Sequence, residues 1–450
     1  MVTENENKIG KSFLAVALVM LLVGSVFGVI ASINYVAPGY SKAWLGFIQL
    51  RPLHVSSIMF FLLIGASGCV YSCIHFIAPN KISSPIAYVQ LALWICAIFV
   101  VFFSYVNMQF GGREYWEFPP QYAIIIVIAW LLFIVNFLKA VLNIKHWRVY
   151  MWMWMTGIFF FLLTFTENYL WEFPYFREHF VKDMTIQWKA NGALVGAWNQ
   201  MIYGTAFFLM EKISKGNKYA GSHLAFRMYF LGLFNLMFNW GHHIYTLPTD
   251  SYVRYVSYIV SMTEWIILAR IIYLFRKTIT DAQKFFHYFP FRFLIASEVW
   301  VFFNLALAIL MSIPVLNLYT HGTHITVAHA MGTTIGINTM IVLGACFEFL
   351  KTDDNKEGNY SKLSNFFFWM LQISNLIFWV TLIIIGLTKG SWQMSNQTYT
   401  FTTMMSNMHG WFMLFVISGS LLMISIVALA IDLLNAYFRR NVFNKKTISR

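Results

Sequence analysis

Residues 54–77 read HVSSIMFFLLIGASGCVYSCIHFI, a continuous apolar run that contains no acid, no lysine and no arginine. A bilayer core about 30 Å thick is crossed by a helix of about 20 apolar residues, so this run alone predicts a transmembrane helix. The rest of the chain has the same character, because 59% of its 450 residues are hydrophobic and only 11% are charged. We therefore interpret the chain as an all-α integral membrane protein.

The same criterion, applied outward from this run, predicts about twelve transmembrane spans. They cover residues 12–35, 54–77, 85–105, 121–143, 150–170, 190–210, 223–246, 253–274, 290–313, 323–350, 364–388 and 407–437. The loops between them are short and contain no Pro-, Gly- or Ser-rich linker, which predicts a single domain over residues 1–450. Lysine and arginine concentrate in the segments on the side of the N-terminus, and this asymmetry predicts that both termini are cytoplasmic.

The charge and cysteine content exclude several other classes of protein. A net charge of +13 on so apolar a chain reflects membrane topology, and no basic stripe outside the apolar runs indicates nucleic-acid binding. The four cysteines all lie in apolar runs and form no Cys-x-x-Cys-His motif, which excludes a disulfide framework and covalently attached c-type haem on this chain. A transporter is the general alternative, but it gives no reason for the histidines described next.

Four of the twelve histidines lie at a matched depth in the outer half of the predicted bundle. His54 opens the second span, His242 and His243 close the seventh, and His329 lies in the tenth. A histidine inside a span is costly without a partner, and neutral imidazole is a ligand of iron and copper. Each could instead be a core histidine bonded to a neighbouring helix, but four at one depth favour a haem or metal site. Adjacent histidines point about 100° apart on a helix, so this pair reaches one metal only at a helix end or distorted turn, for which Gly241 supplies freedom.

Four short motifs occur in a recognisable order along the chain. They are Arg51-Pro-Leu-His54, Gly111-Gly-Arg-Glu-Tyr115, Gly241-His-His243, and Thr320-His-Gly-Thr323 followed by Val327-Ala-His329. With these motifs the chain resembles the haem-copper oxidase superfamily over essentially its whole length, specifically the large subunit of nitric oxide reductases and the related cbb-type oxidases. The resemblance implies a twelve-helix bundle in the bacterial cytoplasmic (inner) membrane. It also implies a separate c-type cytochrome subunit or soluble electron donor, because this chain has no haem c motif.

The resemblance also implies a role for individual residues. His54 would be one axial ligand of a low-spin haem b, and His329 the proximal ligand of a high-spin haem b. His242 and His243 would bind the second metal, which is non-haem iron in the reductases and copper in the oxidases. The remaining assignments are Glu264 as a carboxylate beside that metal, Glu114 as a ligand of a calcium ion, and Arg51, Arg113 and His321 as neighbours of the haem propionates.

Two ligand positions depart from the family pattern. The His-x-His of the tenth span reads His329-Ala-Met331 here, so that Met331 becomes the second axial ligand of the low-spin haem, or else only packs and that haem is lost. At the head of the sixth span, Asn191 stands where the family has a third histidine for the metal. One turn later Val195 replaces a glutamate of the reductases. An amide oxygen is a harder ligand than imidazole, which disfavours copper and favours iron.

These residues favour a nitric oxide reductase-like enzyme that reduces NO to N2O with electrons from the low-spin haem. Leu236 replaces the tyrosine that cbb-type oxidases carry before their histidine pair, which disfavours an oxygen reductase. The change to Asn191 resembles the pattern of nitric oxide dismutases, which convert NO into N2 and O2. A non-catalytic haem protein or NO sensor is the third alternative, and the retained histidines and Glu264 argue against it.

Overall fold

The computed structural model describes residues 7–213, 223–263, 266, 288–351, 361–395 and 399–448. Within these ranges the chain is helical, and its one β-type feature is an isolated bridge between Arg113 and Trp116. The first half contains α1 (Lys8–Ile33), α2 (Phe47–Ile77), α3 (Ser84–Val106), η1 (Pro120–Tyr122), α4 (Ala123–Val141), α5 (Val149–Glu167), η2 (Leu170–Glu172), α6 (Pro174–Arg177) and α7 (Phe180–Ile213).

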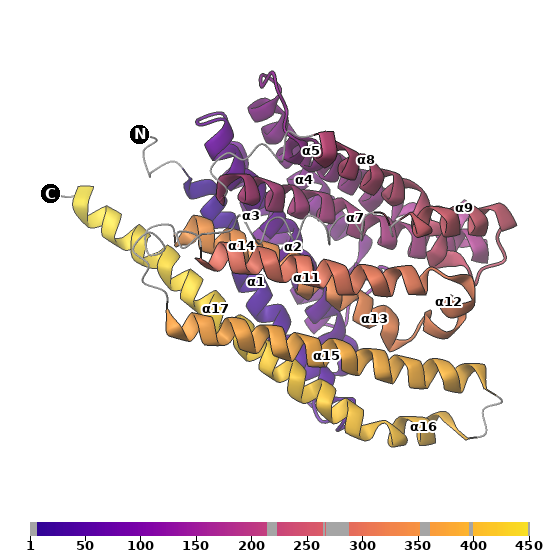
Figure 1. Cartoon of the computed structure of the whole chain (residues 1–450). Helices are drawn as coiled ribbons and strands as arrows, with labels where there is room; N and C mark the ends of the chain where they lie inside the picture. Colours follow the sequence, from indigo (N-terminus) through magenta and orange to yellow (C-terminus); the bar gives the residue numbers. More distant parts are fainter. Residues whose placement is uncertain are drawn as a thin grey trace.

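The second half contains shorter and more irregular helices around the candidate histidines. Its elements are α8 (His223–Phe238), the 3-10 helix η4 (Asn239–Ile244), α9 (Ser251–Met262), α11 (Tyr288–Met311), α12 (Pro314–Thr320), α13 (His324–Met331), the π-helix η6 (Gly332–Thr339), α14 (Met340–Leu350), α15 (Lys362–Met394), α16 (Phe401–Asn407) and α17 (His409–Ile448). Figure 1 shows the long helices gathered into a bundle, with α15 and α17 side by side.

Nine helices in the described part of the chain are long and apolar enough to cross a membrane, and they coincide with nine of the twelve predicted spans. The other three stay predictions. The segment 190–210 lies inside the 34-residue helix α7, whose buried polar side chains reduce its apolar character. The helical part of 223–246 is only 16 residues long before it tightens into η4, and 253–274 falls partly outside the described residues.

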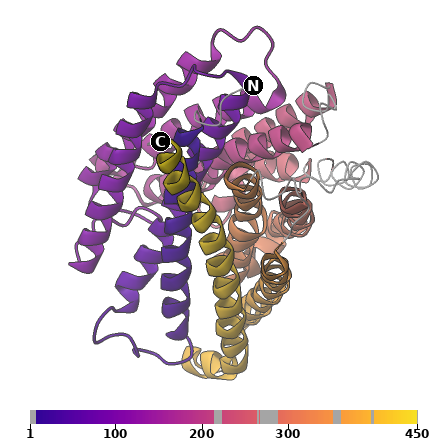
Figure 2. The same ribbon diagram turned by 90° about the vertical axis from the view of Figure 1, so that its left-hand side faces the viewer.

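The two ends of the chain meet at one end of the bundle. Ser12, in the second turn of α1, shares a hydrogen bond of 3.1 Å with the Tyr437 hydroxyl near the end of α17. Figure 2 shows α17 running beside α1 over much of the bundle. This contact places the start of α1 and the last part of α17 at the same end of the bundle, and the count of twelve spans stays a prediction. The cytoplasmic placement of that end stays a prediction.

Helix α2, which carries the first candidate histidine, lies at the centre of the bundle. In its apolar 18-residue stretch 94% of the residues are buried, whereas the share is 33% in the corresponding stretches of α3 and α17. Helix α1 packs along it at very short range, because a Cβ atom at Gly68 would lie 2.9 Å from Phe13 Cβ and 3.0 Å from the Leu14 backbone nitrogen. Small residues permit such close packing between membrane helices, where dispersion replaces the hydrophobic effect as the attractive force.

Gly68→Ala should therefore destabilise the protein by about 1–3 kcal/mol, because the new methyl group pushes α1 and α2 apart. The measurement is the midpoint of thermal unfolding in detergent. Gly410→Ala is the matched control, since nothing lies within 4 Å of a Cβ atom at that helical glycine. Equal midpoints for the two variants would contradict close packing of α1 on α2.

Candidate active site

His54 sits in α2 with one face of its ring against α1. Its Nδ1 lies 2.7 Å from the carbonyl oxygen of Gly24. A carbonyl can only accept, so Nδ1 carries the proton and Nε2 keeps its lone pair. The ring also fills the space at Gly28, where a Cβ atom would lie 2.7 Å from Nδ1. A histidine oriented by a carbonyl in this way is suited to axial ligation of a haem iron through Nε2.

His329 and Met331 lie in α13, which continues directly into the π-helix η6. Asn304 of α11 donates a hydrogen bond of 2.7 Å to Thr333 in that π-helix, which ties the ligand-bearing segment to α11. Met331 packs against the apolar cluster formed by Ala328, Phe378 and Leu382. The thioether of Met331 is thus in a dry environment, as both its alternative roles require, and its ligation stays a prediction.

His242 and His243 lie in the 3-10 helix η4 at the end of α8, and their ring centroids are 4.3 Å apart with a 36° tilt. The distorted turn expected for this pair is present. The reason for Gly241 is different from the expected backbone freedom, because a Cβ atom there would lie 2.8 Å from Ser257 Cβ of α9. Gly241 therefore allows α9 to pack closely against the histidine-bearing turn.

His321 and His329 lie in the same region of the fold as this pair. His242 and His243 are each within electrostatic range of His321 and His329. The His321 ring meets Trp188 of α7 edge-on, at 4.9 Å between ring centres. Burial of His321, which lies between α12 and α13, lowers its pKa and keeps the imidazole neutral at pH 7.

Helix α7 forms the wall facing the histidine pair. The ring of His243 occupies the space above Gly192, where a Cβ atom would lie 2.5 Å from Nε2. The neighbouring Asn191 is buried, and its Oδ1 accepts a hydrogen bond of 2.9 Å from Asn168 at the end of α5. The amide oxygen of Asn191 is thus engaged by a side chain of α5, and its role as a metal ligand stays a prediction.

The described residues provide part of a metal site. Within them, no group of three or more His, Cys, Asp or Glu side chains is arranged to hold a metal ion. The donor set consists of the two imidazoles of His242 and His243, to which Asn191 would add one oxygen. Two neutral nitrogens and an amide oxygen fit a borderline metal such as iron. Glu264, the predicted carboxylate beside the metal, lies outside the described residues.

The charged residues expected around haem propionates are paired with carboxylates of the chain itself. Arg51 lies 2.7 Å from Glu117 and 3.5 Å from Glu114. Arg113 makes two hydrogen bonds of 2.8 and 3.0 Å to Asp183. Glu114, assigned to calcium by resemblance, is about half exposed and has a guanidinium beside it. These roles toward propionates and calcium stay predictions.

Two of these carboxylates, Glu117 and Asp183, are not singled out by the sequence. Burial raises the pKa of Glu117, and the Arg51 guanidinium opposes that shift. Glu117 follows Glu114 by three residues in the loop between α3 and α4, and Asp183 lies in the first turn of α7, before Asn191. Their positions in outer segments are visible in the sequence, but their partners are set by tertiary packing.

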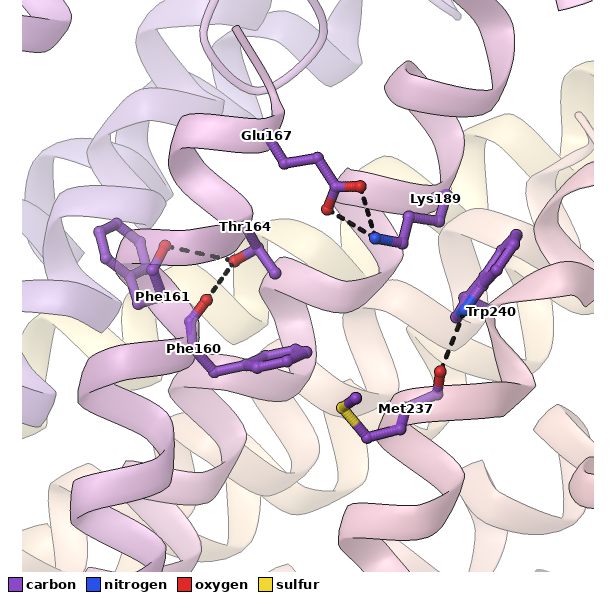
Figure 3. A network of polar contacts seen from close by, with 7 residues as sticks. All are labelled: Phe160, Phe161, Thr164, Glu167, Lys189, Met237 and Trp240. Atoms are coloured by element: carbon purple, nitrogen blue, oxygen red, sulfur yellow. Dashed lines mark hydrogen bonds and ion pairs between the residues drawn. The ribbon is translucent and has the colours of Figure 1, made fainter. Parts of the chain in front are cut away.

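A further ion pair lies on the outer side of the histidine turn (Figure 3). Lys189 of α7 contacts both carboxylate oxygens of Glu167 at the end of α5, at 2.5 and 2.6 Å. The same ammonium lies 5.7 Å from the ring centre of Trp240, which immediately precedes Gly241. Trp240 in turn donates its indole N–H to the Met237 carbonyl at 3.1 Å. The sequence alone indicates Lys189 only as one of the outer basic residues.

Curated relatives with two different activities resemble the chain about equally. A cbb3-type cytochrome c oxidase subunit of Stutzerimonas stutzeri is 22% identical over an alignment that covers 94% of this chain and 93% of the relative. A nitric oxide reductase subunit of the same organism is 22% identical over 410 residues, which cover 85% of this chain and 84% of the relative. Identity alone therefore does not separate the two activities.

The fold and the family agree with each other. A heme-copper terminal oxidase dimer solved by cryo-EM matches with a TM-score of 0.72 at 14% identity, over 97% of this chain and 84% of that chain. The family model described as Cytochrome C and Quinol oxidase polypeptide I matches residues 8–421. Members of this family are multi-pass membrane oxidoreductases that bind haem and a second metal, iron or copper. The chain belongs to the cytochrome c and quinol oxidase polypeptide I family of the haem-copper oxidase superfamily.

Proposed function

We propose that the chain is a nitric oxide reductase-like enzyme that converts two NO, two electrons and two protons into N2O and water. A high-spin haem b and a non-haem iron, when bound, would supply the two metal centres for this reduction, and a low-spin haem b would supply electrons. The observation that supports the proposal is the packing of His243 on α7 at Gly192, with His329 within electrostatic range of both His242 and His243. His54 would hold the low-spin haem separately, against α1.

Leu236, which lies on α8 before the histidine pair, favours NO over O2 as substrate. Leu236 of α8 packs directly on Gly196, one turn along α7 from the contact between His243 and Gly192. An aliphatic side chain at this position cannot donate the electron and proton that O–O cleavage requires from a tyrosine. It does keep water away from a small apolar gas, which is what a site for NO needs.

The surroundings support a membrane enzyme that is fed from outside the chain. The residues proposed for haem propionates, Arg51, Arg113 and His321, lie on the side of the bundle opposite to both chain ends. A c-type cytochrome subunit or soluble donor would deliver electrons there. A calcium ion at Glu114 would have to share that carboxylate with Arg51. We place the protein in the bacterial inner membrane with both termini in the cytoplasm.

A second candidate function is dismutation of NO to N2 and O2, which requires no external electrons. The observation in its favour is the pair of substitutions on α7. Asn191 offers an amide oxygen in place of an imidazole, and Val195 packs against the hydrophobic core in place of a carboxylate. We prefer reduction, because the low-spin haem residue His54 would be superfluous in an enzyme without a donor.

The proposal predicts two non-covalent haems b per chain. Acidified acetone should extract all haem from the purified protein, because the chain has no covalent attachment motif. His54→Ala should abolish the low-spin optical signal and leave the high-spin signal, since the two haems have separate histidines. Haem retained after extraction, or less than one haem per chain, would contradict the assignment.

The role of Met331 can be tested separately by Met331→His. If Met331 ligates the low-spin haem, the oxidised protein should show a near-infrared sulfur-to-iron charge-transfer band, and the variant should lose it. The reduction potential should also fall, because a thioether ligand raises the potential relative to a second imidazole. An unchanged spectrum and potential would mean that Met331 only packs in its apolar cluster.

Reduction and dismutation differ in their need for electrons. Isotopically labelled NO should yield labelled N2O only when a reductant is supplied, as followed by mass spectrometry. Labelled N2 and O2 formed without reductant would favour the second candidate instead.

The role of Asn191 can be tested by Asn191→His. Metal analysis of the purified variant should show increased retention of the non-haem iron, because a third imidazole completes a facial ligand set. If metal content and products both stay unchanged, Asn191 is not a ligand.

A further inference from the structure

The turn that carries His242 and His243 contacts helices α7, α9 and α12. On α9, Ser257 donates a hydrogen bond of 2.6 Å to the carbonyl of Asn239. On α12, Asn317 donates a hydrogen bond of 3.4 Å to the carbonyl of His242. On α7, the only interaction of a charged group with this turn among the described residues is that of Lys189 with the Trp240 ring, at 5.7 Å.

The α7 side differs from the other two because the contact beside the imidazole has no side chain. His243 packs closely on the backbone at Gly192, which has no side chain of its own to contact the ring. Lys189 and Gly192 are three residues apart and lie on the same face of the helix. The contact between the Lys189 ammonium and Trp240 is therefore a second point at which α7 holds residues 239–244, about one helical turn nearer to the N-terminus of α7.

Glu167 gives Lys189 a fixed position. Both of its carboxylate oxygens contact the ammonium, and the two side chains are only 22% and 23% exposed. Glu167 is also the last residue of α5, where a carboxylate opposes the helix dipole and benefits from a neighbouring cation. A partly covered pair with two short contacts restrains a lysine side chain that would otherwise be mobile. Figure 3 shows this arrangement, with Lys189 between Glu167 and Trp240.

We propose that Lys189 is a positioning residue for the histidine pair. Its ammonium, held by Glu167, retains Trp240 by a cation–π contact and thereby holds the turn Asn239–Ile244 against α7. Both imidazoles then stay at the geometry in which they bind a metal. This inference rests on the proposed function for the identity of the metal, but the restraint on the turn does not depend on it.

The test uses the purified full-length protein and two measurements. Hydrogen exchange reports how often the amides of residues 239–244 open, and loss of non-haem iron to a chelator reports how firmly the metal is held. In Lys189→Met we expect both rates to rise by about tenfold or more, the scale of effect found for outer partners of metal ligands. Lys189→Arg should restore both rates, because a guanidinium retains the charge and the contact with the indole.

Two controls separate this role from general loosening. Lys182→Met removes a comparable contact on the same helix, since Lys182 lies 3.5 Å from the Tyr175 ring, and should leave both rates unchanged. The double variant Glu167→Gln/Lys189→Met leaves no unpaired carboxylate and should still show fast exchange. Adding Trp240→Leu to Lys189→Met should cause little further change, because both act through one contact.

Wild-type exchange at residues 239–244 in the double variant, or an equal effect of Lys182→Met, would overturn the inference. A wild-type protein that holds haem but no non-haem iron would overturn the proposed function instead. In that case the exchange measurement still decides the role of Lys189. The two failures are therefore distinguishable in one set of samples.

Discussion

The contact between the His243 imidazole and the bare backbone of α7 at Gly192 is the constraint around which the candidate site is arranged. It brings α8 and η4 close enough to α7 that the ring of His243 replaces a side chain on that helix. Leu236 packs against Gly196 one turn further along the same helix. A larger residue at Gly192 would separate these elements, and the short 3-10 turn could not follow α7 as closely.

The outer face of the bundle is organised by pairs of opposite charge. Arg51 with Glu117, Arg113 with Asp183, and Lys189 with Glu167 each join segments that are far apart in the sequence. In a bundle with few charged residues, such pairs fix how the ends of neighbouring helices meet. Each arginine proposed for a propionate therefore already has a carboxylate competing for it.

The sequence predicted the apolar spans well, because they depend on local composition, and nine of them agree with helices of the described chain. His329 lies within electrostatic range of His242 and His243, and the ligand roles of these histidines stay predictions. The partners of Arg113 and Lys189 could not be predicted, since they come from helices that meet only in the folded bundle. The span predicted at 190–210 is a longer helix that begins at Phe180, because its polar first turns project beyond the apolar stretch. The amide partner of Asn191 depends equally on where α5 ends.

The π-helix between Gly332 and Thr339 has a consequence for how this helix relates to those of other family members. A π-helix contains more residues per turn than an α-helix, and the side-chain hydroxyl of Thr339 donates a further hydrogen bond of 2.7 Å to the carbonyl of Thr334 within it. The half that carries His329 and Met331 is therefore out of α-helical phase with the half that begins at Met340. Removing one residue from this segment would rotate one half by about 100° relative to the other. We therefore expect insertions and deletions to be tolerated in the loops but not within residues 332–339, because the length of this segment sets the directions in which His329 and Met331 point.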